Sequence, residues 1–468
     1  MHGSEGSDSS VKIFANIFIT FVGAGVLGLP FAFKEAGILE GIVIMILISA
    51  VSIKAMLLLI DCKYRLNRRP EIRKIYKIVE VETEENHQGN TYEKLDLLES
   101  HTNESNGFRH DVQDVKELKS SQKELDYGDL GYYALGNTGR TVVDTVIVIS
   151  QTGFCCAYLI FITENLGSYI VKFATFQWLL FLLPPLAFLA MLRHLNHLAI
   201  FSLFADFANV FAYCVVFWFD FEHIHVLKKL HPKEISLDGF PFFLGIAIYC
   251  FEGAGMVLSL EASVLPSVRS KFRKIFVLAL VLVTTLYIVF GVCGYLSFGP
   301  ETENIITLNL PPGLFPLLVK GCLCFSLFFT YPMMMFPVSR IIENITTDDP
   351  LRNLNRGNII RCSMVLLTGL IVLAIPNFTT LMALVGASCC TLLAFILPAI
   401  FHMKLCHETL TMRQLVFDWI LIILGVVGCL IGTHDALHRM FSPEIPVGNS
   451  ATLIPRVVQS NLTGHKST

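Results

Sequence analysis

The sequence predicts an all-α polytopic membrane protein with eleven transmembrane helices. Its 468 residues are 53% hydrophobic and only 16% charged, which excludes an ordinary soluble domain. The mean hydropathy of the chain is +0.61. Apolar runs of about 20 residues, the length that crosses the hydrocarbon core of a bilayer, recur along nearly the whole sequence. A lipid bilayer is therefore the first partner that the sequence predicts.

The apolar runs fall into two groups separated by one long polar segment. The predicted spans are residues 12–34, 38–60, 141–169, 176–192, 198–219, 240–260, 275–298, 313–341, 359–376, 380–403 and 415–433. Residues 12–62 hold helices 1 and 2, and residues 127–433 hold helices 3 to 11. Residues 1–11 form a polar tail without the basic start of a cleavable signal peptide.

Basic residues set the predicted orientation, because Lys and Arg accumulate in the short loops on the cytoplasmic side. With a cytoplasmic N-terminus, the inner flanks include Lys63, Arg65, Arg68, Arg69, Arg193, Arg269, Lys271, Arg273, Lys274, Arg340, Arg361 and Arg413. The outer loops carry few, among them Lys34 and Lys172. An odd number of spans then places residues 434–468, a polar tail, on the non-cytoplasmic side.

Residues 63–126 are the one substantial polar segment, and they are predicted to form a disordered acidic cytoplasmic loop. The segment starts basic and then becomes acidic, with scarcely any apolar cluster that could build a core. A regulatory docking segment is the alternative. The stretch from Tyr127 to Gly136 is different, because its pattern indicates a short amphipathic helix leading into the third span.

The first span is interrupted by glycine and proline in the run from Gly23 to Pro30. The tripeptide Gly23-Ala24-Gly25 returns as Gly253-Ala254-Gly255 inside the sixth span. Glycine and proline weaken a helix, and loose backbone within a bilayer is tolerated where it lines a protein cavity. Paired broken helices are typical of transporter sites. The alternative is that the small residues serve tight helix packing.

Two helix breaks would expose backbone groups of partial positive charge and backbone groups of partial negative charge. Freed N–H groups attract anions and freed carbonyls attract cations, which together suit the zwitterion of a free α-amino acid. Glycines 23, 25, 253 and 255 would let the substrate approach the main chain. Tyr158, Phe251 and Leu323 are candidates for the pocket around the substrate side chain.

Glu252 lies at the second break, and an acidic group within a span is a functional candidate. Three roles are open: it could cap freed N–H groups, balance the substrate ammonium, or carry a coupled proton. Glu261, at the end of the same span, is expected to form an ion pair with the basic segment from Arg269 to Lys274.

Other classes of function find little support in the sequence. We expect no metal and no cofactor, because the histidines and cysteines lack ligand spacing. We expect no enzyme, because the spans contain no nucleophile elbow or paired catalytic carboxylates. We also expect no nucleic acid partner.

Several long motifs occur in order along the chain. They are the run from Phe14 to Lys34, Phe251-Glu252-Gly253 through Glu261, Gly294 to Gly299, Asn304 to Pro311, Tyr331-Pro332 with Phe336-Pro337, and Ile375 to Phe378. With these motifs the sequence resembles the amino acid/auxin permease (AAAP) family. Within it, the chain is most similar to the vacuolar AVT-type transporters and the animal proton-coupled amino acid transporters. The resemblance covers every span.

The resemblance implies a LeuT-like fold, in which spans 1–5 and 6–10 form a 5+5 inverted repeat plus one helix. It implies secondary active transport of small neutral amino acids coupled to protons. The substrate contacts carried over are Thr20, Gly23, Gly25 and Val26 on the first span, and Phe251, Glu252, Gly253 and Gly255 on the sixth. Ala24 and Tyr158 complete the candidate site, with Glu252 as the candidate for proton coupling.

One position departs from the animal branch of the family. Asn16 stands where animal proton-coupled members carry a histidine implicated in coupling. This difference leaves the proton site open and favours a vacuolar or lysosomal membrane over the plasma membrane. An amino acid sensor that uses the same pocket and signals through the 63–126 loop is the alternative function.

Overall fold

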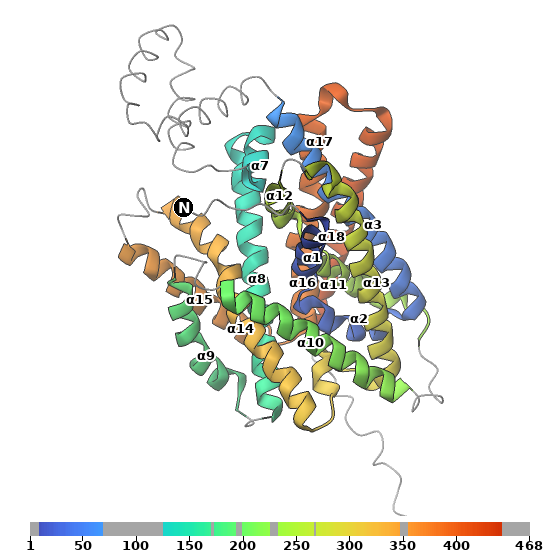
Figure 1. Cartoon of the computed structure of the whole chain (residues 1–468), viewed down its shortest axis with the longest axis vertical. Helices are drawn as coiled ribbons and strands as arrows, with labels where there is room; N and C mark the ends of the chain where they lie inside the picture. Colours follow the sequence, from blue (N-terminus) through green and yellow to red (C-terminus); the bar gives the residue numbers. More distant parts are fainter. Residues whose placement is uncertain are drawn as a thin grey trace, which may run out of the picture.

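A computed structural model describes residues 9–68, 125–169, 173–192, 199–224, 233–265, 268–346 and 354–441. These residues form helices and no β-strand, as Figure 1 shows. The α-helices are α1 (Ser10–Phe21), α2 (Leu29–Ala36), α3 (Ile38–Asn67), α7 (Tyr127–Leu135), α8 (Asn137–Tyr169), α9 (Thr175–Ala190), α10 (Ala199–Ile224), α11 (Phe240–Cys250), α12 (Ala254–Ala262), α13 (Phe272–Phe298), α14 (Leu314–Thr346), α15 (Leu354–Ala374), α16 (Phe378–Val385), α17 (Leu397–Leu405) and α18 (Met412–Phe441).

The length and hydropathy of these helices make the chain a polytopic membrane protein. Among the described residues, eight helical segments are long and apolar enough to cross a bilayer, and a bent pair at the N-terminus makes a ninth. The predicted span 176–192 corresponds to α9, a shorter apolar helix (Thr175–Ala190). The predicted span 198–219 corresponds to α10 (Ala199–Ile224), whose side chains are described from Phe207 to Phe219. The count of eleven therefore stays a prediction.

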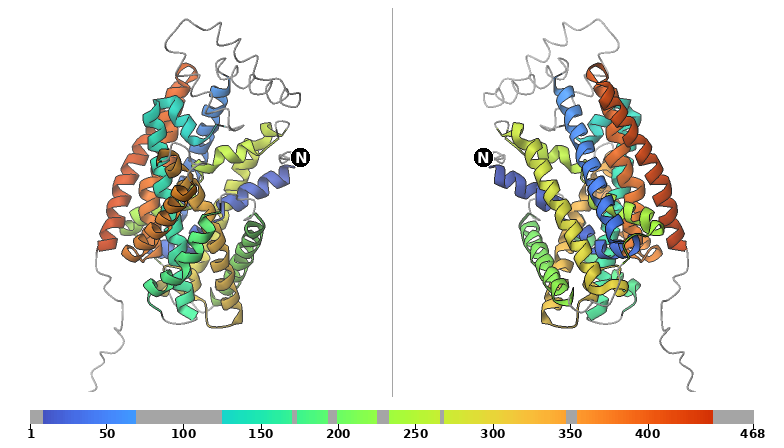
Figure 2. Two further views of the ribbon diagram at one scale, coloured as in Figure 1. Left: turned by 90° about the vertical axis from the view of Figure 1, so that its left-hand side faces the viewer. Right: turned by 90° about the vertical axis from the view of Figure 1, so that its right-hand side faces the viewer.

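The first span is broken, as the sequence predicts. Helix α1 ends at Phe21, a single 3₁₀ segment covers Ala24–Gly28, and α2 starts at Leu29. The two arms of the span differ in direction by 46°. Gly23, with φ −104° and ψ −175°, is extended between them. In the side views of Figure 2, the dark blue α1 runs obliquely away from the other helices toward the N-terminus.

The sixth predicted span is broken as well. Helix α11 ends at Cys250 and α12 begins at Ala254, so Phe251, Glu252 and Gly253 lie between the two arms. Both glycine tripeptides therefore coincide with a change in backbone conformation. The prediction that they mark helix breaks is confirmed.

Close packing holds the two arms of the first span against α11 and α13. Helix α1 packs on α13, and α2 packs on α11 and α13. The ring of Phe33 on α2 lies edge-on to Phe243 on α11, with centroids 5.0 Å apart. A Cβ atom at Gly291 of α13 would come within 2.3 Å of the Phe33 ring. Glycine at 291 thus makes room for the aromatic contact that anchors α2.

Two local features bear on other predictions. The short helix expected after Tyr127 is confirmed as α7, which starts with a capping box between Asp126 and Asp129. The predicted span 380–403 is less regular than expected, because π-helical turns at Gly386–Cys390 and Leu392–Ile396 separate α16 from α17. Helix α3 continues to Asn67 and α18 to Phe441, so the starts of the predicted 63–126 loop and of the predicted 434–468 tail are helical. Most of that loop, and the part of that tail beyond Phe441, lie outside the described residues.

Candidate functional site

A cavity lies between the two helix breaks. It contains about 560 Å³ of space not filled by atoms, including the part that opens toward solvent. Its walls come from α1, the 3₁₀ segment, α8, α11, α12, α13 and α14. The lining residues are Thr20, Phe21, Gly23, Ala24, Gly25, Gln151, Phe154, Tyr158, Tyr249, Cys250, Glu252, Gly255, Met256, Tyr287 and Met334.

Most of the predicted site residues lie around this cavity. Those that line it are Thr20, Gly23, Ala24, Gly25, Tyr158, Glu252 and Gly255. Val26, Phe251, Gly253 and Leu323 are not among the lining residues. Phe251 instead packs against the ring of Tyr287, with centroids 5.5 Å apart. Gly253 leaves room for Phe21, whose ring would lie 2.3 Å from a Cβ atom at that position.

The glycines that line the cavity differ in the space around them. An added Cβ atom at Gly23 or Gly255 would meet no atom within 4 Å. At Gly25 it would lie 3.0 Å from Cys250 Sγ and 3.3 Å from Tyr249 Cδ1. Gly23 and Gly255 thus border open space, whereas Gly25 brings the first break close to α11.

Tyrosine hydroxyls donate hydrogen bonds to main-chain carbonyls at the breaks. The Tyr287 hydroxyl on α13 donates to Phe21 O and lies 3.4 Å from Cys250 O. The Tyr213 hydroxyl on α10 donates to Gly23 O at 3.1 Å. These bonds compensate in part for the helical bonds lost at the breaks. Sequence reasoning missed both tyrosines, because neither is close in sequence to a glycine tripeptide.

Glu252 is the acidic residue of the cavity lining. The backbone N–H groups of Ala254 and Gly255, at the start of α12, face its carboxylate. Its Oε2 atom is buried and has no hydrogen-bond partner in the described part of the chain. The carboxylate is therefore in contact with the freed N–H groups and still has an acceptor for a ligand. The geometry is compatible with all three roles considered for Glu252.

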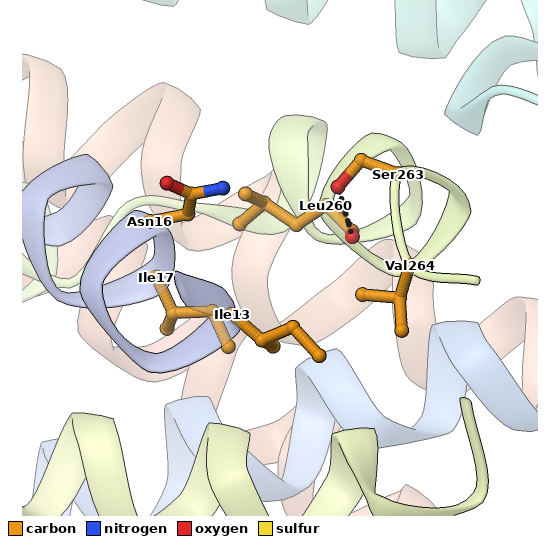
Figure 3. A pocket seen from close by; sticks show the side chains of 6 residues that line it. All are labelled: Ile13, Asn16, Ile17, Leu260, Ser263 and Val264. Carbon is orange, nitrogen blue, oxygen red and sulfur yellow. Dashed lines mark hydrogen bonds between the residues drawn. The ribbon is translucent and has the colours of Figure 1, made fainter. Parts of the chain in front are cut away.

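A second, smaller cavity lies along the same two half-helices. Ile13, Asn16 and Ile17 of α1 form one side, and Leu260, Ser263 and Val264 form the other (Figure 3). Asn16 lies one helical turn before Thr20, whose hydroxyl donates to Asn16 O at 2.6 Å. Both cavities are therefore bordered by α1 and by the segment that begins with α12.

A cluster of charged and polar side chains holds the C-terminal end of α12 in place. Glu261 is fully buried and forms ion pairs with Lys63 of α3 at 2.8 Å and with Arg269 at 3.0 Å. The Tyr64 hydroxyl donates to the same carboxylate at 2.8 Å. The predicted pairing of Glu261 with the basic segment is confirmed, and Lys63 and Tyr64 are additional partners. We call these four residues the Glu261 cluster.

Known proteins resemble this chain over most of its length. A family model described as "Transmembrane amino acid transporter protein" matches residues 6–80 and 111–437. The Arabidopsis thaliana protein "Amino acid transporter AVT3C" is 34% identical over 462 residues, covering 93% of this chain and 92% of the relative. "Amino acid transporter ANT1" of the same plant is 31% identical over 449 residues, covering 92% of each chain.

Proposed function

Because this chain belongs to the transmembrane amino acid transporter family, we propose that it is a secondary active transporter of small neutral amino acids. The substrate would bind in the cavity between the two helix breaks. The observation that carries this proposal is that one cavity is lined by both glycine tripeptide regions and by the carboxylate of Glu252.

The lining of the cavity supports a neutral zwitterion as the substrate. Glu252 provides a negative charge that can balance an ammonium group, and backbone N–H groups near Gly25 can meet a carboxylate. No Lys or Arg occurs among the described lining residues, so a second carboxylate on the substrate would find no balancing charge there. Phe154, Met256 and Met334 suit an apolar side chain.

Coupling to protons is part of the proposal. Glu252 is the candidate carrier of the proton, because its carboxylate lies at the site and has a buried, unpaired oxygen. The resemblance to vacuolar family members, together with Asn16 in place of a histidine, favours a vacuolar or lysosomal membrane. The breaks in the first and sixth predicted spans fit a LeuT-like 5+5 inverted repeat with an eleventh helix.

Transport by the purified full-length chain in proteoliposomes tests the proposal. Uptake of a radiolabelled panel of neutral, acidic and basic amino acids is measured with and without an imposed pH gradient. We expect accumulation of small neutral amino acids that the gradient drives. Protein-free liposomes are the control. Binding of amino acids without any uptake would contradict the carrier and favour the sensor.

A further inference from the structure

Gln151 of α8 lines the cavity. It is polar but uncharged, and it lies far in sequence from both glycine tripeptides. It lies seven residues before Tyr158, so the two side chains are on the same face of the helix. Both line the cavity between the helix breaks. The Oε1 atom of Gln151 is buried and accepts no hydrogen bond from the described residues.

Two unpaired acceptor oxygens therefore line one cavity, Gln151 Oε1 and Glu252 Oε2. A buried polar atom without a partner is unfavourable and calls for an explanation, such as a ligand that supplies the missing donor. The hydroxyls of Thr20 and Tyr287, which line the same cavity, are directed to the backbone carbonyls of Asn16 and Phe21. A group with several N–H donors would complement the two oxygens.

The α-ammonium group of an amino acid is such a donor, since it carries three N–H bonds. We propose that Gln151 is a substrate-binding residue whose amide oxygen accepts a hydrogen bond from this ammonium, which makes the transporter selective for primary amines. This inference rests on the proposed transport function. It assigns the ammonium end of the substrate to the part of the cavity wall that Gln151 of α8 forms.

The amide of Gln151 and the carboxylate of Glu252 would contribute differently to binding of the ammonium group. Glu252 supplies charge, but a proton bound to its carboxylate removes part of its capacity to accept. The amide oxygen of Gln151 does not titrate and remains an acceptor in either state. A carrier that holds a proton and an ammonium group together would thus keep one acceptor for the ammonium.

The test compares L-alanine with N,N-dimethyl-L-alanine, whose ammonium retains one N–H bond. In Gln151→Met, which keeps the side-chain length without the amide, we expect the KM for L-alanine to rise about tenfold. That ratio corresponds to about 1.4 kcal/mol. The KM for the dimethyl compound should change less than about twofold, so the preference for the primary amine should largely disappear.

Three further variants keep the test decisive. Gln151→Glu retains an oxygen at the same distance from the backbone and should retain the preference. Gln151→Asn withdraws the oxygen by one methylene and should weaken it, which gives a second reading if the Met variant is poorly produced. Phe154→Leu, on the same cavity wall, should leave the ratio of the two KM values unchanged.

The possible outcomes separate the inference from the transport function. If the wild-type chain accumulates no amino acid from the panel, the proposed function fails. If it accumulates L-alanine and Gln151→Met or Gln151→Asn keeps the wild-type ratio of KM values, the role of Gln151 is wrong and the transport function stands.

Discussion

The glycines of the two breaks occupy different surroundings, so equivalent substitutions should have different effects. Gly23 and Gly255 face open space, and Gly25 faces Cys250 and Tyr249. Gly253 is covered by the ring of Phe21. A methyl group at 253 is therefore a packing change, whereas one at 23 or 255 changes the volume of the cavity.

We expect Gly25→Val to abolish uptake while the protein is still produced and inserted into the membrane. A valine side chain would press on Cys250 and Tyr249, since its Cβ atom would lie 3.0 Å from Cys250 Sγ, and these two residues and Gly25 all line the cavity, so the walls of the binding site would be displaced. Proteoliposome uptake and thermal stability are measured for the same preparation. Uptake with normal affinity in this variant would remove the first break from the binding site.

Gly253→Ala is the matched packing control. Its methyl group would meet the Phe21 ring at 2.3 Å, so we expect lower thermal stability before any specific change in substrate affinity. Gly23→Ala should instead leave the stability within about 0.5 kcal/mol and raise the KM, because its methyl group would meet no atom within 4 Å and would project into the cavity. The two variants thus separate the packing role of small residues from their role in binding.

Glu252→Gln tests whether this residue carries the coupled proton. If it does, the amide mimics the protonated form, so exchange of amino acid should persist while accumulation driven by a pH gradient is lost. If Glu252 only caps the break, an amide oxygen can take over this role toward the N–H groups of Ala254 and Gly255, and coupling should survive. The measurement is the ratio of gradient-driven uptake to equilibrium exchange in the same vesicles.

An unchanged ratio in Glu252→Gln would exclude the proton-carrier role. The search would then turn to the other acidic residues of the spans, such as Asp144 and Glu164. Asp144 lies 3.7 Å from Arg140 on the same helix, which makes it a weaker candidate than Glu252. Glu261→Gln should retain the wild-type ratio, because that carboxylate is not among the lining residues of the cavity and is paired with Lys63 and Arg269.

At the scale of helices, the Glu261 cluster joins α12 to α3 and to the segment before α13. We expect Glu261→Gln to lower the stability by about 3 kcal/mol or more, because it leaves the ammonium of Lys63, only 4% exposed, without its carboxylate. Lys63→Met should cost less, since Arg269 and Tyr64 still contact Glu261. Thermal unfolding in detergent gives the order of the two variants.

A more exposed ion pair at the C-terminal end of α3 is a control for the Glu261 cluster. Arg65 of α3 pairs with Glu408, and the two side chains are 29% and 66% exposed. We expect Arg65→Ala to change the stability by about 1 kcal/mol or less. An equal loss of stability in Arg65→Ala and Glu261→Gln would show that burial of the cluster is not what makes it important.

The sequence predicts the helix breaks well because glycine and proline act locally on the backbone. It does not predict the π-helical turns near Gly386, which depend on packing between helices. A Cβ atom at Gly386 would lie 1.9 Å from the carbonyl oxygen of Gly245 on α11. Contact between two residues so distant in sequence leaves no periodic pattern in either segment.

The same reason explains which site residues the sequence analysis found. Thr20, Gly25 and Glu252 lie in or beside the breaks that it recognised, whereas Gln151 and Tyr287 reach the cavity from unbroken helices. For Gln151 a signal was present, because it is a polar residue one heptad before Tyr158 on an apolar helix. For Tyr287, nothing distinguishes it from other buried aromatic residues of α13.

For the whole molecule, we predict that the C-terminal tail lies on the non-cytoplasmic side. The odd number of predicted spans and the distribution of Lys and Arg support this orientation. Asn461 in the sequon Asn461-Leu462-Thr463 should then receive a glycan, visible as a mass shift that Asn461→Gln removes. A protease-protection assay reports the same orientation without depending on the sequon.

Asn377 provides an internal comparison for the glycosylation assay. It also heads a sequon, Asn377-Phe378-Thr379, but its side-chain oxygen accepts from the Thr380 N–H and caps α16. We expect no glycan at this position, so Asn377→Gln should not change the mass. A tail that is accessible to protease from the cytosolic side would show that the number of spans is even.

The Tyr287 hydroxyl has one proton and two carbonyls within reach, Phe21 O at the first break and Cys250 O at the second. The contact with Phe21 O is the closer one, and Phe21 O also accepts from the Gly23 N–H at 2.9 Å, whereas Cys250 O lies 3.4 Å from the hydroxyl. Tyr287 of α13 therefore ties the end of α1 to the end of α11, so a single side chain helps to fix the spacing of the two breaks around the cavity.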